Sequence, residues 1–586
     1  MGKNDFLIGV FALATMTFVA CSNEDKLGEE RSNGNGSTEV VEGEPTWAKF
    51  IFKLGKDSGK SRATGDEHEG TVAEKSIKNL RAYIFSESGS FEAKTDGVTV
   101  DGNGVEHTTT LKLTSGKKKV YVVANMQDEW ITSTTTTAQF EAIALTHCTK
   151  AGRIAHTKGT EKTEAVSRVG SFDKISGNSD AAANGFLMAN VLAATEYTLY
   201  PGISAENCSK PSYGSSAEME QNNHLEVSIS RAAAKLQATY ANADALTLKD
   251  NANKTLGKLL TPTFTVRNLP VQSYMFLHNQ ANGFLTPFYT MTGTSSTFED
   301  FAKYYDEVNE PNLDLKASTD GEAIRSIYLP ENSNQTPVRG NTTYVLVKGV
   351  FAPAADVMIN SVTVQGAGEN LTINNKFDDT DYTTGGTEVP PFFIVPEWEN
   401  QIYTAPADFG GNLATYGLGM ILKTYLNKAG KQKWLNAVDE DSAVDEGDIE
   451  NPVSVYYGSS FSTSEGIYSI VTIKKYSHPK NGGVPGYQES VEGTIRIFQY
   501  TGGTCYYRVN VEDNMDGKTE ANNLFYSVMR NRFYNVNISR ITSIGYPDDE
   551  DVTVDPTDPI NQKTYMQAHI TVEPWTKVEQ DAELGM

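Results

Sequence analysis

Cysteine is scarce in this chain, with four in 586 residues, which is too few for a fold that depends on many disulfides. One of them, Cys21, directly follows an N-terminal apolar stretch. The other three, Cys148, Cys208 and Cys505, are an odd set. Their spacing leaves a bridge between Cys148 and Cys208 open, but we expect buried free thiols.

Long apolar runs and the common catalytic motifs are also missing. No apolar run after Ala20 approaches the roughly 20 residues of a membrane-spanning helix. The eight histidines are scattered, and the sequence has no HExxH, no CxxC, no Walker loop and no GxSxG at a strand-to-helix turn. Carboxylates are abundant, yet no pattern pairs two of them as acid and base. We therefore expect neither an enzyme nor a bound cofactor or metal.

Positive charge is in deficit, because 50 Lys and Arg residues stand against 74 Asp and Glu residues, a formal net charge of −24. Such a chain is a poor partner for nucleic acid or for an anionic membrane surface. The densest acidic run, residues 548–551, has the composition of a loose calcium site. Charge blocks of this kind usually stay in water, so we interpret it as part of a solvated linker.

The N-terminus has the pattern of an exported lipoprotein. Lys3 precedes an apolar run over residues 6–20, and that run ends in small residues directly before Cys21. The pattern predicts a signal peptide over residues 1–20 and acylation of the Cys21 thiol, which would hold the chain at a membrane outside the cytoplasm. Residues 21–45 are rich in Gly, Ser, Asn and Glu, and we expect a flexible tether there.

A first β-strand followed by a loop is expected over residues 46–62. Apolar and charged residues alternate from 47 to 54, as in a strand with one buried side. The expected buried positions are Ala48, Phe50, Phe52 and Leu54. The loop over residues 56–70 contains no apolar residue larger than alanine and carries the dipeptide Arg62-Ala63. Proteases cut exposed polar loops of this kind, although an ordinary hairpin connection has the same composition.

Most of the remaining sequence is typical of short strands. Gly, Asn, Asp and Ser turns separate them, with a helix-like stretch at residues 137–145. This pattern predicts an all-β protein built of sandwiches. The chain is long enough for more than one core. We place an N-terminal β-sandwich domain at residues 63–280 and a C-terminal one at residues 281–546.

The C-terminus repeats the alternation of the first strand. An acidic, proline-rich spacer over residues 547–563 precedes a last segment over residues 564–586. Fully extended, the spacer reaches on the order of 50 Å, enough to leave its own domain. Either the last strand folds back onto the C-terminal sandwich as an edge strand, or it reaches another subunit. The apolar positions on one face of that strand are Met566, Ala568, Ile570 and Val572, followed by Trp575.

Three stretches carry a resemblance to a known family: GNTTYVLVKG at residues 340–349, RNRFYNVNISRITSIG at 530–545 and QKTYMQAHITVEPW at 562–575. Weaker matches are SGKKKVYVVAN at 115–125, ISRAAAKLQA at 229–238 and the segment that ends in Cys21. In these stretches the sequence resembles the fimbrillins of the Bacteroidia, the shaft subunits of the type V pilus, and among them the shaft subunit of minor fimbriae. The middle segments, at about 284–327 and 379–465, do not take part in the resemblance.

The resemblance implies two transthyretin-like β-sandwich domains with a C-terminal donor strand. It also implies export as a lipoprotein, cleavage after an arginine in the loop behind the first strand, and assembly by strand exchange. Arg62-Ala63 lies where that cleavage would fall, and Lys56 and Lys60 are other sites for a trypsin-like protease. The implied partners are further copies of the chain, anchor and tip subunits, the protease and, before cleavage, the outer membrane. The implied role is adhesion and biofilm formation as part of a cell-surface fimbrium.

Two other interpretations stay open. A monomeric surface lipoprotein that binds glycans would use exposed aromatic residues such as Trp398, Trp434, Tyr456 and Tyr457, although core packing explains most aromatic residues in sandwiches. An anchor or tip subunit is disfavoured, because an anchor would lack the cleavage loop and a tip would carry a distinct binding domain.

Overall fold

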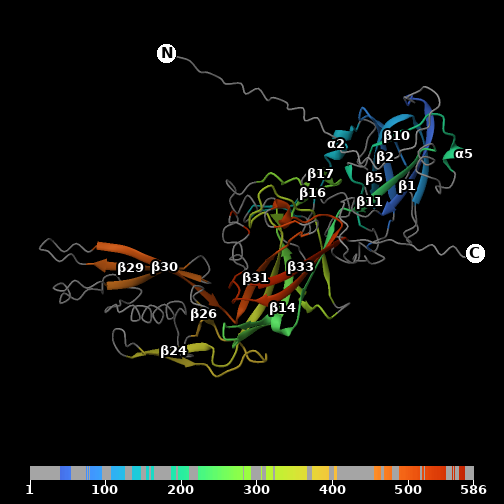
Figure 1. Ribbon diagram of the computed structural model, residues 1–586. Coiled ribbons are helices and arrows are strands. Elements are labelled where there is room, and N and C mark those ends of the chain that lie inside the picture. Colours follow the sequence, from blue (N-terminus) through green and yellow to red (C-terminus); the bar gives the residue numbers. More distant parts are fainter. Residues whose placement is uncertain are drawn as a thin grey trace, which may run out of the picture. The chain divides into compact units, whose positions relative to one another are not determined.

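The computed structural model describes residues 40–54, 74, 77, 79–95, 107–125, 135–146, 153–157, 160–163, 186–192, 196–209, 222–280, 283–291, 305–306, 312–320, 324–365, 372–394, 401–404, 455–462, 468–477, 488–514, 518–519, 522–548, 557, 560 and 566–574. Within these ranges the protein consists mostly of β-strands in several sheets (Figure 1), which confirms the predicted β-rich class. The short helical segments are α2 (Thr137–Glu141), α5 (Ala205–Cys208) and the 3₁₀ turns η2 (Ala243–Leu246) and η7 (Asn523–Tyr526).

A sheet in the N-terminal part of the chain follows the strand order β3-β2-β5-β9-β11-β1-β4, with β10 paired to β5. Apolar side chains from both ends of this order meet in one cluster, called here the N-terminal core, which contains Phe50, Val122 and Val227. The strands are β1 (Pro45–Leu54), β2 (Leu80–Ser86), β3 (Phe91–Lys94), β4 (His107–Thr114), β5 (Gly116–Ala124), β9 (Met188–Ala189), β10 (Glu196–Leu199) and β11 (His224–Arg231).

The helix-like stretch at residues 137–145 is only partly helical. Helix α2 begins with a capping box, in which the Thr136 hydroxyl accepts from the Gln139 backbone N–H and the Gln139 side chain accepts from the Thr136 N–H. The helix ends at Glu141, and β6 (Ala144–Thr146) follows and pairs with β16 (Gln272–Tyr274). This distant pairing overrides the local helical pattern.

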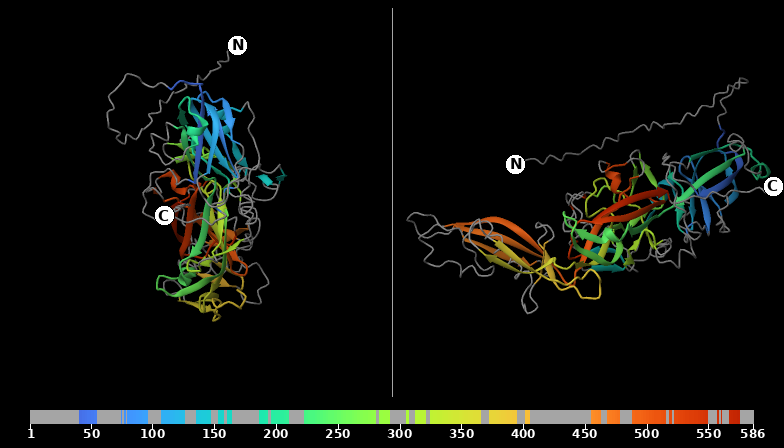
Figure 2. Two further views of the ribbon diagram at one scale, coloured as in Figure 1. Left: turned by 90° about the vertical axis from the view of Figure 1, so that its right-hand side faces the viewer. Right: turned by 60° about the horizontal axis from the view of Figure 1, so that its bottom comes forward.

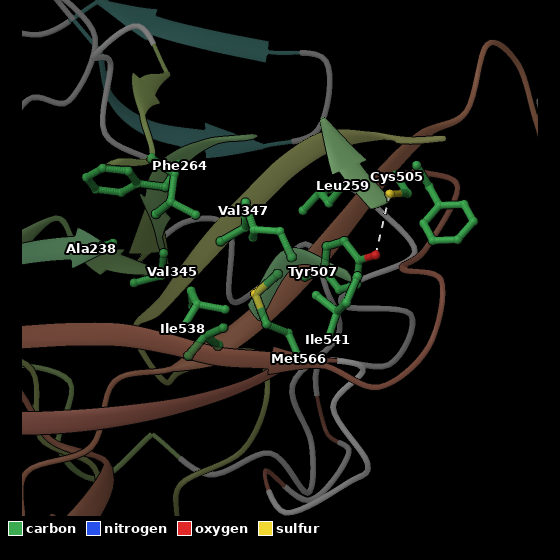
Figure 3. Packing of buried hydrophobic residues seen from close by; sticks show 14 of the residues in the cluster. Ala238, Leu259, Phe264, Val345, Val347, Cys505, Tyr507, Ile538, Ile541 and Met566 are labelled. Carbon is green, nitrogen blue, oxygen red and sulfur yellow. Dashed lines mark hydrogen bonds between the residues drawn. The ribbon is translucent and has the colours of Figure 1, made fainter. Parts of the chain in front are cut away.

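Two further sheets share a second cluster, called here the C-terminal core, and residues from both sheets interdigitate in it (Figure 3). One sheet has the order β21-β12-β32-β33 with β22 beside β12, and the other has the order β13-β14-β23-β31 with β20 beside β14. The first consists of β12 (Ala234–Tyr240), β21 (Lys316–Ala317), β22 (Ser326–Leu329), β32 (Arg532–Ile541) and β33 (Met566–Pro574). The second consists of β13 (Thr247–Lys249), β14 (Thr255–Arg267), β20 (Leu313–Asp314), β23 (Tyr344–Pro353) and β31 (Thr504–Asn510).

The remaining strands form one larger sheet and three additional small pairs. The sheet follows the order β25-β24-β27-β26-β30-β29-β28, and Phe392 and Tyr500 at the β26–β30 pair stack in the C-terminal core. Its strands are β24 (Met358–Gln365), β25 (Thr372–Phe377), β26 (Phe392–Ile394), β27 (Ile402–Thr404), β28 (Val455–Ser462), β29 (Tyr468–Ser477) and β30 (Gln488–Tyr500). The described pairs are β7 (Arg153–Thr157) with β8 (Thr160–Thr163), β15 (Leu269–Pro270) with β19 (Tyr305–Asp306), and β17 (His278–Gln280) with β18 (Gly283–Leu285).

The two cores divide the chain near residue 233. Strand β11 ends in the N-terminal sheet, while β12, from Ala234 onward, pairs in parallel with β32. Figure 2 shows these green and red strands in the same body. Met275 and Phe276 return to the N-terminal part, where they pack beside Tyr121. We expected residues 63–280 in one domain, whereas β12 and β14 of that range contribute to the C-terminal core. The domain boundary itself stays a prediction.

Candidate assembly site

Strand β1 has a paired neighbour on each side. It pairs in parallel with β11, with Lys49 opposite His224, and antiparallel with β4, with Lys49 opposite Thr110. Ala48, Phe50 and Phe52 are buried in the N-terminal core, at the positions that the alternation predicts. The rings of Phe50 and Phe52 lie nearly parallel, with centroids 6.2 Å apart. Ile51 is buried too, so the burial of β1 is not limited to the predicted face.

Two buried thiols lie in the described part of the chain. Cys208 and Cys505 are both free. Burial raises the pKa of the Cys208 thiol to about 11 and that of the Cys505 thiol to about 12. The Nε2 atom of His224, which begins β11, lies 2.8 Å from the carbonyl oxygen of Cys208, and burial lowers the pKa of this imidazole. These thiols are packing elements, because a protonated buried thiol is a poor nucleophile. Cys148 lies outside the described residues.

The terminal strand β33 lies at the edge of its own C-terminal sheet. It pairs antiparallel with β32, with Ile570 opposite Val536. Met566 is buried in the C-terminal core (Figure 3). Ile570 is buried there too, Ala568 packs against this core, and Gln567 is exposed, as the alternation predicts. In this structure the strand is therefore folded back onto its own subunit.

Two asparagine amides also hold the terminal segment. The Asn514 side chain donates to the carbonyl oxygen of Ile570 at 2.9 Å, and the Asn510 side chain donates to that of Ile560 at 3.2 Å. Ile560 belongs to the spacer, which we expected to be solvated, yet its side chain is buried against Phe525 and Tyr526. The spacer therefore has at least one fixed point on the subunit.

Glu74 makes contacts that the sequence does not reveal. It is the first described residue after the loop that contains Arg62. Its carboxylate lies 3.0 Å from Lys235 Nζ and accepts from the Tyr328 hydroxyl at 2.5 Å. Its carbonyl oxygen accepts from Arg231 Nε at 2.8 Å. All of these partners are more than 150 residues away in the sequence, so no local pattern identifies them. The cluster ties the chain behind the loop to the junction of β11 and β12.

Several of the predicted site residues cannot be placed. The structure describes the backbone but not the side chains of Leu54, Val572, Tyr456 and Tyr457. Outside the described residues lie Cys21, Arg62, Ala63, Trp575, Trp398 and Trp434.

No described helix is long and apolar enough to cross a membrane. No three or more His, Cys, Asp or Glu side chains among the described residues are grouped as metal ligands. Of the acidic run at 548–551, the structure describes Asp548 alone.

Two family models match the sequence at its two ends. Residues 48–231 match the major fimbrial subunit protein (FimA). Residues 498–581 match the C-terminal part of the major fimbrial subunit protein type IV, fimbrillin. The first match runs from within β1 to the end of β11, and the second contains the whole of β33. The matches therefore include most of β1 and the whole of β33, the two strands that the sequence singles out.

Solved structures add relatives of low sequence identity. A fimbrilin (FimA) from Porphyromonas gingivalis is 13% identical, with a TM-score of 0.38, and the match covers 91% of this chain and 99% of that one. A fimbrial assembly protein from Parabacteroides distasonis is 10% identical, with a TM-score of 0.23 and coverage of 76% and 99%. The tip fimbrial protein Mfa3 from Porphyromonas gingivalis is 11% identical, with a TM-score of 0.28 and coverage of 57% and 100%. No curated protein sequence matches the chain.

The assignment rests on the two sequence matches, because all three TM-scores are low. They define a structural subunit of fimbriae, and the chain is a fimbrillin related to the major fimbrial subunit FimA. This family consists of structural subunits, which confirms the expectation that the chain is not an enzyme. A fimbrial subunit implies a place in cell-surface fimbriae.

Proposed function

We propose that this fimbrillin is a shaft subunit, of the minor-fimbrium type, that polymerises by donor-strand exchange. It is exported as a lipoprotein through Cys21, cut after Arg62 by a trypsin-like protease, and joined when the terminal strand of one subunit replaces β1 of the next. The observation that carries the proposal is the position of β1, an inner strand followed by the loop that contains Arg62. Anchor and tip subunits of the same fimbrium are the further partners.

Removal of β1 uncovers the N-terminal core. Phe50 and Phe52 lose their burial, which stabilises by roughly 1.5–3 kcal/mol per side chain. The facing edges of β11 and β4 also lose their ladder partner, a state that proteins normally avoid. While β1 is in place, another strand has no room there. The uncut precursor is therefore expected to stay monomeric.

The terminal strand is a suitable replacement because it gains a neighbour in the exchange. Among the described strands, β33 pairs with β32 alone. In the place of β1 it would pair with both β11 and β4 by β-strand addition. Each ladder hydrogen bond contributes roughly 1 kcal/mol, so a second ladder offsets part of the cost of withdrawing Met566 and Ile570 from the C-terminal core. The contact is head-to-tail and does not close, so it builds a filament.

The two cores support a proposal of two transthyretin-like sandwich domains. Each has its own set of apolar residues, and the first set lies mainly before residue 234. In this proposal the N-terminal domain receives the donor strand, and the C-terminal domain stores that strand until assembly.

Arg62→Ala tests the activation step. We expect full-length protein at the cell surface that forms no ladder in unboiled detergent gels, because β1 stays in place. Ser61→Ala is the matched control, and it should be cut and assemble normally. N-terminal sequencing of the surface protein identifies the bond. Filaments built from uncut Arg62→Ala protein would refute activation by cleavage.

Deletion of everything after Lys563 tests the donor strand. The truncated subunit is expected to be exported and cut but to form no ladder with its own kind. It should still accept the terminal strand of an intact subunit, and it then occupies one end of the filament because it has no strand to donate. Normal filaments from the truncated subunit alone would rule out strand exchange.

A further inference from the structure

A buried site encloses the hydroxyl of Thr46 at the start of β1. Thr46 is only 1% exposed. Its Oγ1 donates to the carbonyl oxygen of Tyr200 at 2.7 Å, and it accepts from the Ile203 backbone N–H at 3.2 Å and from Asn223 Nδ2 at 3.0 Å. A hydroxyl has one donor and two acceptor positions, and all three are used here. We call the three groups from Tyr200, Ile203 and Asn223 the hydroxyl site.

Asn223 connects the hydroxyl site to β1 and to Tyr200, whose carbonyl oxygen lies 3.0 Å from its Nδ2. It is fully buried in the turn before β11, with φ at 55°, a left-handed conformation that asparagine tolerates better than most residues. Its Oδ1 accepts from the Tyr200 N–H at 2.8 Å, and its Nδ2 also lies 3.0 Å from the carbonyl oxygen of Trp47. Its own carbonyl accepts from the Lys49 N–H at 2.9 Å. A single side chain and its backbone thus bind three of the first residues of β1.

The sequence directly before β33, which lies outside the described residues, repeats the pattern of a threonine followed by an aromatic residue. Thr46 is the only serine or threonine of β1, and an aromatic residue, Trp47, follows it. When Met566 is placed on Ala48, Thr564 falls on Thr46 and Tyr565 falls on Trp47. A slip of two residues keeps the apolar face but brings Met566 or Gln562 to the hydroxyl site. Apolar alternation cannot distinguish these registers, whereas a site for one hydroxyl can.

We propose that the hydroxyl site sets the register of strand exchange by receiving Thr564 of the incoming subunit. This inference rests on the proposed strand exchange and adds the residue that the acceptor recognises. A slipped strand leaves the half-buried Ile203 N–H without its hydroxyl acceptor, and it removes the hydroxyl from Asn223 Nδ2 and the Tyr200 carbonyl oxygen, which stay 3.0 Å from each other. Loss of each hydrogen bond weakens binding by roughly two- to tenfold.

Competition between subunits tests the recognition of the hydroxyl. Wild-type and Thr564→Val subunits are activated together in equal amounts, and mass spectrometry counts the terminal peptides in detergent-resistant joints. Valine keeps the shape and removes the hydroxyl, so we expect the variant to be under-represented by about tenfold or more. Thr564→Ser is expected to compete within about threefold of wild type, and Thr571→Val is the matched control that should compete equally. Thermal unfolding of the uncut variants separates this effect from a folding defect.

Cysteine cross-linking reads the register directly. In the proposed register Gln567 takes the place of Lys49, which lies opposite Thr110 on β4. A donor with Gln567→Cys is therefore expected to form a disulfide with an acceptor that carries Thr110→Cys and lacks all residues after Lys563. An acceptor with Lys112→Cys in place of Thr110→Cys should not cross-link, because it reports a two-residue slip.

The outcomes separate the register from strand exchange itself. Equal incorporation of Thr564→Val, or cross-linking through Lys112→Cys, overturns the register while strand exchange stands. Normal filaments from subunits that lack all residues after Lys563, with no cross-link at either position, remove strand exchange and this inference with it.

Discussion

Phe50→Ala in the uncut precursor should loosen β1 far more than it loosens the rest of the protein. Phe50 is fully buried in the N-terminal core and stacks with Phe52. Replacing a buried phenylalanine by alanine costs about 3–5 kcal/mol, because it removes apolar contacts and leaves a cavity. The C-terminal core contains no atom of this side chain, so its stability is expected to change little.

Hydrogen exchange measured by mass spectrometry on peptides from residues 45–54 is a suitable assay. A loss of 3–5 kcal/mol in local opening accelerates exchange of the β1 amides by about two to four orders of magnitude. Thr110→Ala, at an exposed position of β4, is the control and should change exchange of β1 by less than about fivefold. Exchange of β1 in Phe50→Ala within about fivefold of wild type would show that this strand does not depend on the core contact.

The other predictions concern export, the donor face and the thiols. Cys21→Ala should leave unprocessed precursor inside the envelope, and wild-type amounts in a surface-labelling experiment would contradict acylation at that residue. Ile570→Asp should abolish ladders and also destabilise the subunit, since Ile570 is buried in its own C-terminal core, whereas Thr571→Asp at the alternate register position should be far milder in both assays. Cys208 and Cys505 should resist a thiol reagent at pH 8 in the native state and react within minutes in urea, and fast native reaction would contradict their burial. Because folding raises both thiol pKa values from 9.0, to about 11 and 12, their contribution to stability is present below pH 9 and lost as the pH rises towards those values.

Local sequence patterns were sufficient to predict which face of β1 and which face of β33 is buried. Alternation has a period of two, and it requires no knowledge of neighbours. It correctly gave Phe50 and Phe52 in β1, and Met566 and Ile570 in β33, as buried positions. The same reasoning gave the β-rich class. The repeated threonine-aromatic pair at residues 46–47 and 564–565 is also visible in the sequence, but it has meaning only once the hydroxyl site is known.

The neighbours of each strand were decided only by the tertiary structure. That β1 is an inner strand depends on β11, which lies more than 150 residues further along the chain. The pairing of β12 with β32 spans nearly 300 residues and moves β12 into the C-terminal core. Asn223 and Glu74 hold their sites together through contacts with residues more than 150 positions away in the sequence. The physical reason is that side-chain alternation is a property of one strand, whereas ladder hydrogen bonds and buried polar contacts join segments that only the folded chain brings together.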